Sequence, residues 1–189
     1  MNANVGMVYP VAATVATYTP GTSISYSAGS NFAEAVSASL SWDRADGHFY
    51  GDDVELDSDN GILGYTIDFE PSGLSDTARG ILLGETVSSS EYTITDKAAP
   101  DVGFGYVRVM RNKGEVKYEG WWFYKVKFGV SSEETRTKER SVEWRVPTLQ
   151  GTGAGVSLDS TGTLSFAQHK TFDTLAAAKS YLNSKAGIT

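Results

Sequence analysis

Residues 116–130 read VKYEGWWFYKVKFGV, a stretch in which two kinds of position alternate along an extended chain. The even positions form one apolar face: Val116, Tyr118, Gly120, Trp122, Tyr124, Val126, Phe128 and Val130. The odd positions form a second face, charged at both ends and aromatic in the middle: Lys117, Glu119, Trp121, Phe123, Lys125, Lys127 and Gly129. This period of two predicts a β-strand, and at about 3.3 Å per residue the strand is roughly 50 Å long. Since a typical strand has about 5–6 residues, we expect a sheet that extends beyond one monomer, as in an assembly protein.

The remaining sequence favours a mainly β fold with two helices. The chain has 22 aromatic residues and 20 glycines, which are common in strands and in the turns between them. Residues 102–110 and 116–130 flank the turn Arg111-Asn112-Lys113-Gly114, which predicts an antiparallel hairpin. Further strands are expected at residues 33–42, 62–69 and 163–169. Cap residues predict a short helix between Ser75 and Gly84 and a C-terminal helix between Asp173 and Gly187.

The length of 189 residues fits one domain with its own core. We expect residues 1–33, which carry no charged side chain, to form an N-terminal arm or edge strands, interrupted at Pro10 and Pro20. Residues 34–189 then form a β-sandwich domain. The uncharged start lacks the positive charges of a secretory signal, and no apolar run approaches the roughly 20 residues of a spanning helix. We therefore expect synthesis in the cytoplasm and no membrane partner.

Charge is distributed unevenly along the chain. The net charge is −7, but residues 1–107 carry 15 acidic and 3 basic side chains, whereas residues 108–189 carry 8 acidic and 13 basic ones. One interpretation is that the two halves neutralise each other within a monomer. The other is head-to-tail complementarity between copies. An acidic chain is also a poor nucleic-acid binder, because affinity for phosphate comes mainly from Lys and Arg.

The segment 43–60 is predicted to be a loop or loose hairpin, and it is rich in acidic residues, among them Asp52, Asp53, Asp57 and Asp59. An EF-hand loop needs Gly at its sixth position and Glu at its twelfth. Counted from position 55, these positions hold Asn60 and Thr66, so this calcium motif is excluded. A solvated loop or a contact surface for basic strands is favoured over an irregular divalent-ion site.

No catalytic, cofactor or metal site is predicted. The chain has no cysteine, and its two histidines, His48 and His169, have no second His or Cys at metal-ligand spacing. Residues 151–155 read GTGAG but lack the last glycine of a dinucleotide fingerprint, so we interpret them as a flexible turn. Because no nucleophile, base and orienting group can be assembled, we expect no enzyme. The alternative function is a carbohydrate-binding β-sandwich in which Trp121 and Phe123 face the sugar.

Short motifs follow one another from about Asp43 onward: YGDD at 50–53, ILLGE at 81–85, DKAAPDVGFGY at 96–106, YKVKF at 124–128, TRTK at 135–138 and FDT at 172–174. In content and order they resemble the major tail proteins that build the tail tube of long-tailed, non-contractile bacteriophages. Residues 1–33 share less of this resemblance.

The resemblance implies a β-sandwich or half-barrel of the tail-tube type, with a short flanking helix and a C-terminal helix. Subunits of this family form hexameric rings that stack into a tube, and each contributes long strands to a barrel shared between subunits. The implied partners are further copies, the tape-measure protein that the tube encloses and tail-terminus proteins, while DNA passes through the lumen without specific binding. The implied location is the virion tail, assembled in the host cytoplasm.

We expect two groups of residues to make the contacts of self-assembly. The hairpin 102–130 is expected to form the barrel wall between neighbours, and the segment 43–60 to contact the adjacent ring. The residues assigned to these contacts are Lys117, Glu119, Trp121, Phe123, Lys125 and Lys127 on the long strand, and Asp52, Asp53, Asp57 and Asp59 in the acidic segment.

Overall fold

Residues 116–130 lie within a long antiparallel hairpin. In the computed structural model, which describes residues 3–32, 35–51, 54–88, 91–93, 96, 98–132 and 147–188, they belong to strand β10 (Glu115–Ser132), which pairs with β9 (Val102–Asn112). The two turn residues, Lys113 and Gly114, have φ values of 48° and 96°. Positive φ at both positions is typical of a two-residue turn whose twist matches that of the strands. The hairpin predicted from the sequence is confirmed.

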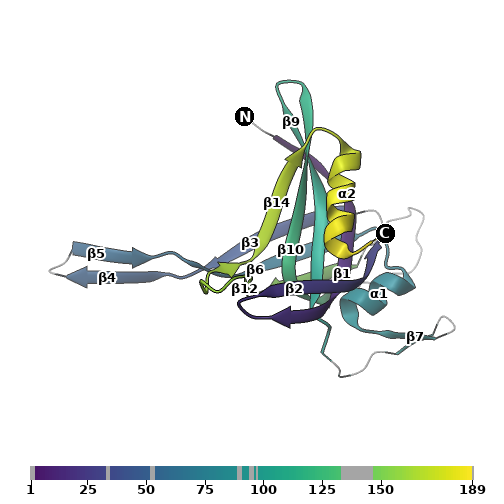
Figure 1. The fold of residues 1–189 in the computed structure, drawn as a ribbon, viewed down its shortest axis with the longest axis horizontal. Helices are drawn as coiled ribbons and strands as arrows, with labels where there is room; N and C mark the ends of the chain where they lie inside the picture. Colours follow the sequence, from purple (N-terminus) through teal and green to yellow (C-terminus); the bar gives the residue numbers. More distant parts are fainter. Residues whose placement is uncertain are drawn as a thin grey trace, which may run out of the picture.

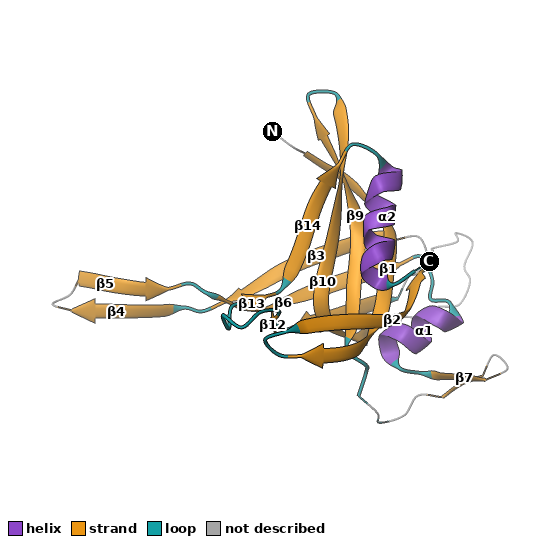
Figure 2. Cartoon of the chain, viewed as in Figure 1, coloured by secondary structure: helices purple, strands orange, loops and turns teal. Residues whose placement is uncertain are grey.

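The described residues place this hairpin inside an eight-stranded antiparallel sheet (Figures 1 and 2). Its order is β2-β1-β9-β10-β11-β6-β3, and β14 pairs with the first half of β10. The other strands of this sheet are β1 (Ala3–Thr19), β2 (Ser23–Asn31), β3 (Ala35–Arg44), β6 (Ile62–Pro71), β11 (Thr148–Gly153) and β14 (Ala167–Phe172). Two-stranded ribbons are formed by β4 (Gly47–Gly51) with β5 (Val54–Asp59), β7 (Thr86–Ser88) with β8 (Glu91–Thr93), and β12 (Val156–Ser157) with β13 (Leu164–Ser165). The fold is mainly β, as predicted.

The short helix α1 (Asp76–Leu83) has the ends predicted from the sequence. The hydroxyl of Ser75 accepts a hydrogen bond from the backbone N–H of Ala78 (3.2 Å), which satisfies one of the free N–H groups of the first turn. Gly84 ends the helix with a φ of 70°, a left-handed conformation that glycine adopts without strain. The helix is anchored by the buried side chains of Ala78, Ile81 and Leu82.

The C-terminal helix α2 (Leu175–Ala186) is present, but its first residue differs from the prediction. The N-cap is Thr174, whose hydroxyl accepts a hydrogen bond from the backbone N–H of Ala177 (3.3 Å). Asp173 is not the cap, because its carboxylate instead lies 2.6 Å from the ammonium of Lys117. Gly187 ends the helix as predicted. The helix covers one face of the main sheet (Figure 2) through the buried residues Ala178, Leu182 and Ala186.

The main sheet buries side chains on both faces, and β10 changes faces along its length. Trp122 and Tyr124 pack in the core that contains α2, whereas Phe123 packs in the core on the opposite face. Between Phe123 and Val126, three steps along β10 match two steps along β9, which is a β-bulge. Beyond the bulge Val126 and Phe128 join the core of Phe123. The prediction of one continuous apolar face from 116 to 130 is therefore wrong.

Residues 3–31 form two strands of the main sheet. β1 pairs with β9 on one side and with β2 on the other, while β2 is the edge of the sheet, as the prediction of edge strands allows. Pro10 does not interrupt β1. The register of β1 with β9 shifts between Val8 and Val11, and at such a bulge a proline is tolerated because no ladder hydrogen bond from its N–H is needed. Pro20 lies in the turn after β1, as predicted. Val11 is fully buried, so this region belongs to the core and is not an arm.

The prediction of a flexible turn at residues 151–155 is wrong for residues 151–153, which belong to strand β11 (Thr148–Gly153). This strand lies between β10 and β6. A Cβ atom on Gly153 would lie 2.0 Å from the ring of Tyr65, and one on Gly151 would lie 2.7 Å from Phe128. The glycines are therefore required because aromatic side chains of the two neighbouring strands lie across β11.

Candidate functional site

The odd face of β10 carries one buried carboxylate, that of Glu119, which contacts three donor side chains. Glu119 is 5% exposed. Its Oε2 atom accepts hydrogen bonds from Nε of Arg108 (2.9 Å) and from Nε1 of Trp121 (2.8 Å), and Arg108 donates a second bond through Nη2. Nδ1 of His169 lies 2.7 Å from Oε1. Three adjacent strands position this cluster, because β9 provides Arg108 and β14 provides His169.

The environment of Glu119 keeps its carboxylate charged. Burial alone raises the pKa of this group, but hydrogen bonds from Trp121 and Arg108, together with the charges of Arg108 and His169, outweigh burial and lower the pKa below its ordinary value. Oε2 accepts hydrogen bonds from Arg108 and Trp121, and Oε1 lies against Nδ1 of His169, so the group is an ion-pair partner within the sheet. A catalytic base would instead need an oxygen that faces a substrate.

The two rings assigned to a carbohydrate platform, Trp121 and Phe123, do not form an open surface. Phe123 is fully buried. The ring of Trp121 is stacked on that of His169, with a centroid distance of 4.5 Å and an interplanar angle of 12°, and the guanidinium of Arg108 lies 5.1 Å from its centroid. The two rings are therefore part of the packing of the sheet.

The three lysines at odd positions of β10 are paired with acidic residues of their own chain. The ammonium of Lys117 lies 2.6 Å from Asp173, and those of Lys125 and Lys127 lie 3.3 Å and 3.7 Å from the two oxygens of Asp101. These pairs agree with charge neutralisation within the monomer for this part of the chain. A role of these lysines between copies stays a prediction.

The acidic segment 43–60 contains the β4–β5 ribbon, which projects from the body of the molecule along its longest axis (Figure 1). The loose hairpin predicted here is confirmed. Asp52 and Asp53 lie outside the described residues, as does the motif at 135–138, and of Asp57 the structure describes the backbone in β5 alone. Asp59 is exposed, and its Oδ1 atom accepts a hydrogen bond from the backbone N–H of Gly61 (2.9 Å).

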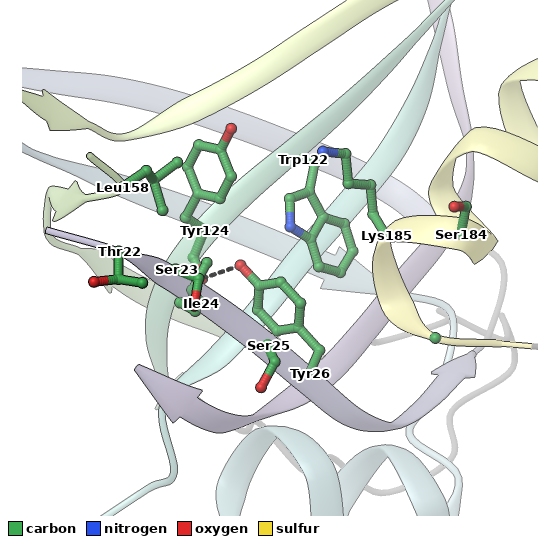
Figure 3. A pocket seen from close by; sticks show the side chains of 11 residues that line it. Thr22, Ser23, Ile24, Ser25, Tyr26, Trp122, Tyr124, Leu158, Ser184 and Lys185 are labelled. Atoms are coloured by element: carbon green, nitrogen blue, oxygen red, sulfur yellow. Dashed lines mark hydrogen bonds between the residues drawn. The ribbon is translucent and has the colours of Figure 1, made fainter. Parts of the chain in front are cut away.

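A cavity of about 420 Å³ lies between β2, β10 and the end of α2 (Figure 3). Its wall includes the rings of Tyr26, Trp122 and Tyr124. The hydroxyl of Tyr26 donates a hydrogen bond to the backbone oxygen of Tyr124 (2.9 Å), and its ring meets Trp122 edge-on at a centroid distance of 5.1 Å. These contacts join β2 to β10, so they stabilise the edge of the sheet.

A second cavity, of about 440 Å³, lies where the sheet curls and brings β1 toward β3. Arg108 and Trp121 of the Glu119 cluster reach its wall, where the charge of Arg108 is already balanced by Glu119. The sequence offered no signal for this cavity, because it depends on how strands distant in the chain pair. The other lining residues are Asn4, Met7, Ala38, Leu40, Trp42 and Tyr106.

The end of the sheet formed by residues 127–132 of β10, β11, β6 and β3 has one apolar and one polar face. The apolar face belongs to the core, as for Phe128 and Ile67. On the polar face Ser37 donates a hydrogen bond to Glu70 (2.7 Å), and the amide of Gln150 donates one to Asp68 (2.9 Å). Further members of this polar face, by strand alternation, are Ser39, Ser41, Asp43, Thr66, Thr152 and Lys127.

This four-stranded unit is open at both edges in the described part of the chain. β3 pairs with β6 alone, and β10 beyond Val126 pairs with β11 alone. The alternation in single strands such as 33–42 was visible in the sequence. The shared polar face was not, because it depends on the register between strands.

No protein-family model, curated protein or solved structure matches this chain. Among the described residues, no three His, Cys, Asp or Glu side chains gather as the ligands of a metal ion would. Neither described helix is long and apolar enough to cross a membrane.

Proposed function

We propose that this protein is a subunit of the tail tube of a long-tailed, non-contractile bacteriophage. In this proposal copies form hexameric rings, and the stacked rings enclose the tape-measure protein and later conduct DNA. The observation that carries the proposal is the four-stranded unit of β10 (residues 127–132), β11, β6 and β3, which has one buried apolar face, one exposed polar face and two open edges.

Such a unit can form a closed wall by pairing with copies of itself. An open strand edge presents unpaired N–H and C=O groups, and closure of a barrel satisfies them all. The apolar face is already covered by the monomer's own core, so the polar face is the one that would line a lumen. Its charged residues are Asp43, Asp68, Glu70 and Lys127, an acidic balance that repels phosphate and lets DNA pass.

The strands assigned to the wall differ from those expected from the sequence. The hairpin 102–130 as a whole was expected to lie between neighbours. However, β9 is covered by β1 on its free side, and the first half of β10 is covered by β14. Only residues 127–132 of β10 keep an open edge in the described structure, so we assign the contacts between neighbours to this segment and to β3.

The β4–β5 ribbon supports the stacking of rings. It extends beyond the body of the molecule (Figure 1), and a ribbon of two strands is marginally stable by itself in water. A contact with an adjacent ring would bury part of it and stabilise it.

Electron microscopy of the purified protein at increasing concentration tests the proposal. We expect rings with a mass of six times 20.3 kDa and, at higher concentration or with the tail initiator present, tubes with a continuous lumen. A particle that stays monomeric under all these conditions, as measured by light scattering, would refute the proposal.

A further inference from the structure

Helix α2 and strand β14 carry three lysines without a carboxylate partner among the described residues. The ammonium of Lys179 lies 4.7 Å from the ring centroid of Tyr9 on β1, so this lysine flanks one side of α2. Lys185 flanks the other side, where it donates a hydrogen bond to Gln168 of β14 (2.9 Å). The third lysine, Lys170, lies on β14 itself, with its ammonium 5.5 Å from the ring of Phe172.

We call this surface on α2 and β14 the lysine face; its residues are Lys170, Lys179 and Lys185. Contacts with rings and an amide hold the ammonium groups in place without neutralising them. The single acidic residue between positions 167 and 188 is Asp173, which is paired with Lys117. Within the described part of the chain, the lysine face therefore keeps three positive charges without an acidic partner, in a protein whose net charge is −7.

The complementary charge lies in the segment of the β4–β5 ribbon, because residues 46–59 contain six acidic residues and no Lys or Arg. Of these acidic residues, Glu55, Asp57 and Asp59 belong to β5 and Asp46 directly precedes β4, while Asp52 and Asp53 lie outside the described residues. In Figure 1 the ribbon extends to one end of the longest axis, while α2 lies in the body on the other side of the molecule. The ribbon of a chain therefore cannot reach the lysine face of the same chain, and the two charged surfaces can meet only between copies.

We propose that the β4–β5 ribbon of one copy docks on the lysine face of a second copy. This inference deepens the proposed function, because it names the partner surface of the ribbon. The two surfaces differ, so the contact is head-to-tail, and repetition of such a contact builds an open stack. Opposite charges steer the encounter and fix its orientation, and salt weakens it because exposed charges are screened. DNA is a poorer occupant, because the net negative charge of the whole chain repels it.

Disulfide trapping tests the contact directly, since the natural chain has no cysteine. Ser58→Cys places a thiol on the exposed surface of β5, and Ser180→Cys places one on the exposed side of α2, next to Lys179. The two full-length variants are mixed and oxidised, and we expect a cross-linked dimer that contains one of each. Ser39→Cys, on the exposed side of β3, replaces Ser58→Cys as the control and is expected to give no such dimer with Ser180→Cys.

Charge variants then test whether the lysines make the contact. In the chain that carries Ser180→Cys, the double substitution Lys179→Glu and Lys185→Glu is added. We expect it to slow cross-linking by about 10-fold at low salt. The matched control is Arg111→Glu with Lys113→Glu, which makes the same change in net charge at the tip of the β9–β10 hairpin and is expected to leave the rate within about 2-fold. Asp46→Lys with Asp59→Lys, in the chain that carries Ser58→Cys, should restore cross-linking to the slowed variant.

The outcomes separate this inference from the proposed function. Rings that form normally while Ser58→Cys and Ser180→Cys give no dimer would overturn the inference alone. Specific cross-linking in a protein that never forms rings would support the inference and refute the tube. Equal slowing by the two charge variants, or binding of a DNA oligonucleotide to the lysine face with no cross-link, would also overturn it.

Discussion

At the scale of single residues, Glu119 is a buried charge whose side-chain contacts link the three strands β9, β10 and β14. We expect Glu119→Gln to lower the free energy of unfolding by about 2–3 kcal/mol, because Arg108 then loses its charged partner in a mostly buried setting. Urea unfolding at neutral pH measures this change. Glu115→Gln is the control on the same strand, since its side chain is 76% exposed, and we expect a loss of no more than about 0.5 kcal/mol. Equal losses in the two variants would contradict the role given to Glu119.

The same carboxylate makes stability depend on pH. Its pKa is lower in the folded protein than its ordinary value, which is about 4.3 in an unfolded chain. Its contribution to stability is therefore complete above the unfolded value and is lost as the pH falls through the folded value. We expect the stability difference between the natural protein and Glu119→Gln to shrink as the pH falls from about 5 to about 3. A difference that grows over this range in urea unfolding would contradict the lowered pKa.

Gly153 is a residue whose lack of a side chain is required by a neighbour. We expect Gly153→Ala to destabilise the protein by about 2 kcal/mol or more, because the new Cβ would overlap the Tyr65 ring and force the core to shift. Gly129→Ala is the control on the adjacent strand, where a Cβ would meet nothing within 4 Å. It should be close to neutral in the same thermal or urea unfolding experiment. Similar effects at both positions would mean that Tyr65 can move aside.

At the scale of secondary structure, the N-terminus of α2 allows a test of which residue caps the helix. We expect Thr174→Ala to cost about 1 kcal/mol, because the hydroxyl that accepts the hydrogen bond from Ala177 is lost. Asp173→Ala removes an exposed ion pair with Lys117 and should cost less. Thermal unfolding of the two variants compares them. A larger loss of stability from Asp173→Ala than from Thr174→Ala would show that Asp173 is the N-cap, as predicted from the sequence.

Elements set by local sequence were predictable, and elements set by a distant partner were not. The caps at Ser75 and Gly84 and the turn at Lys113-Gly114 follow from residues within a few positions of one another. The bulge in β10 was not visible, because it depends on the pairing with β9. The strand character of residues 149–153 likewise depends on pairing with β6, whose residues lie about 80 positions or more away in the chain.

The Glu119 cluster shows that prediction of the candidate site from sequence is limited in the same way. Alternation along β10 placed Glu119 and Trp121 on one face, which the hydrogen bond between them confirms. The partners on the neighbouring strands, Arg108 and His169, could not be assigned, because strand order and register fix them. The packing of Trp121 against His169 and Arg108 could not be predicted for the same reason, because these side chains come from other strands.

At the scale of the whole molecule, the open edge of β3 decides whether copies can form a barrel. Successive N–H groups along a strand point to opposite neighbours, so of Ser39 and Leu40 one donates toward β6 and the other toward the open edge. We expect that, of the variants Ser39→Pro and Leu40→Pro, one is strongly destabilised and the other folds with stability close to that of the natural chain, because proline is tolerated on an edge strand where its missing N–H faced solvent.

Whichever of the two proline variants folds then tests ring formation, because its stability is close to that of the natural chain. It lacks a donor that a neighbouring copy would need, and its ring constrains the edge against which residues 127–132 of that copy would pair. We therefore expect it to form no rings under conditions in which the natural protein does, as seen by electron microscopy and by mass. Its β4–β5 ribbon and lysine face are unchanged, so disulfide trapping between Ser58→Cys and Ser180→Cys should persist in it. Normal rings from this variant would show that β3 is not a wall edge.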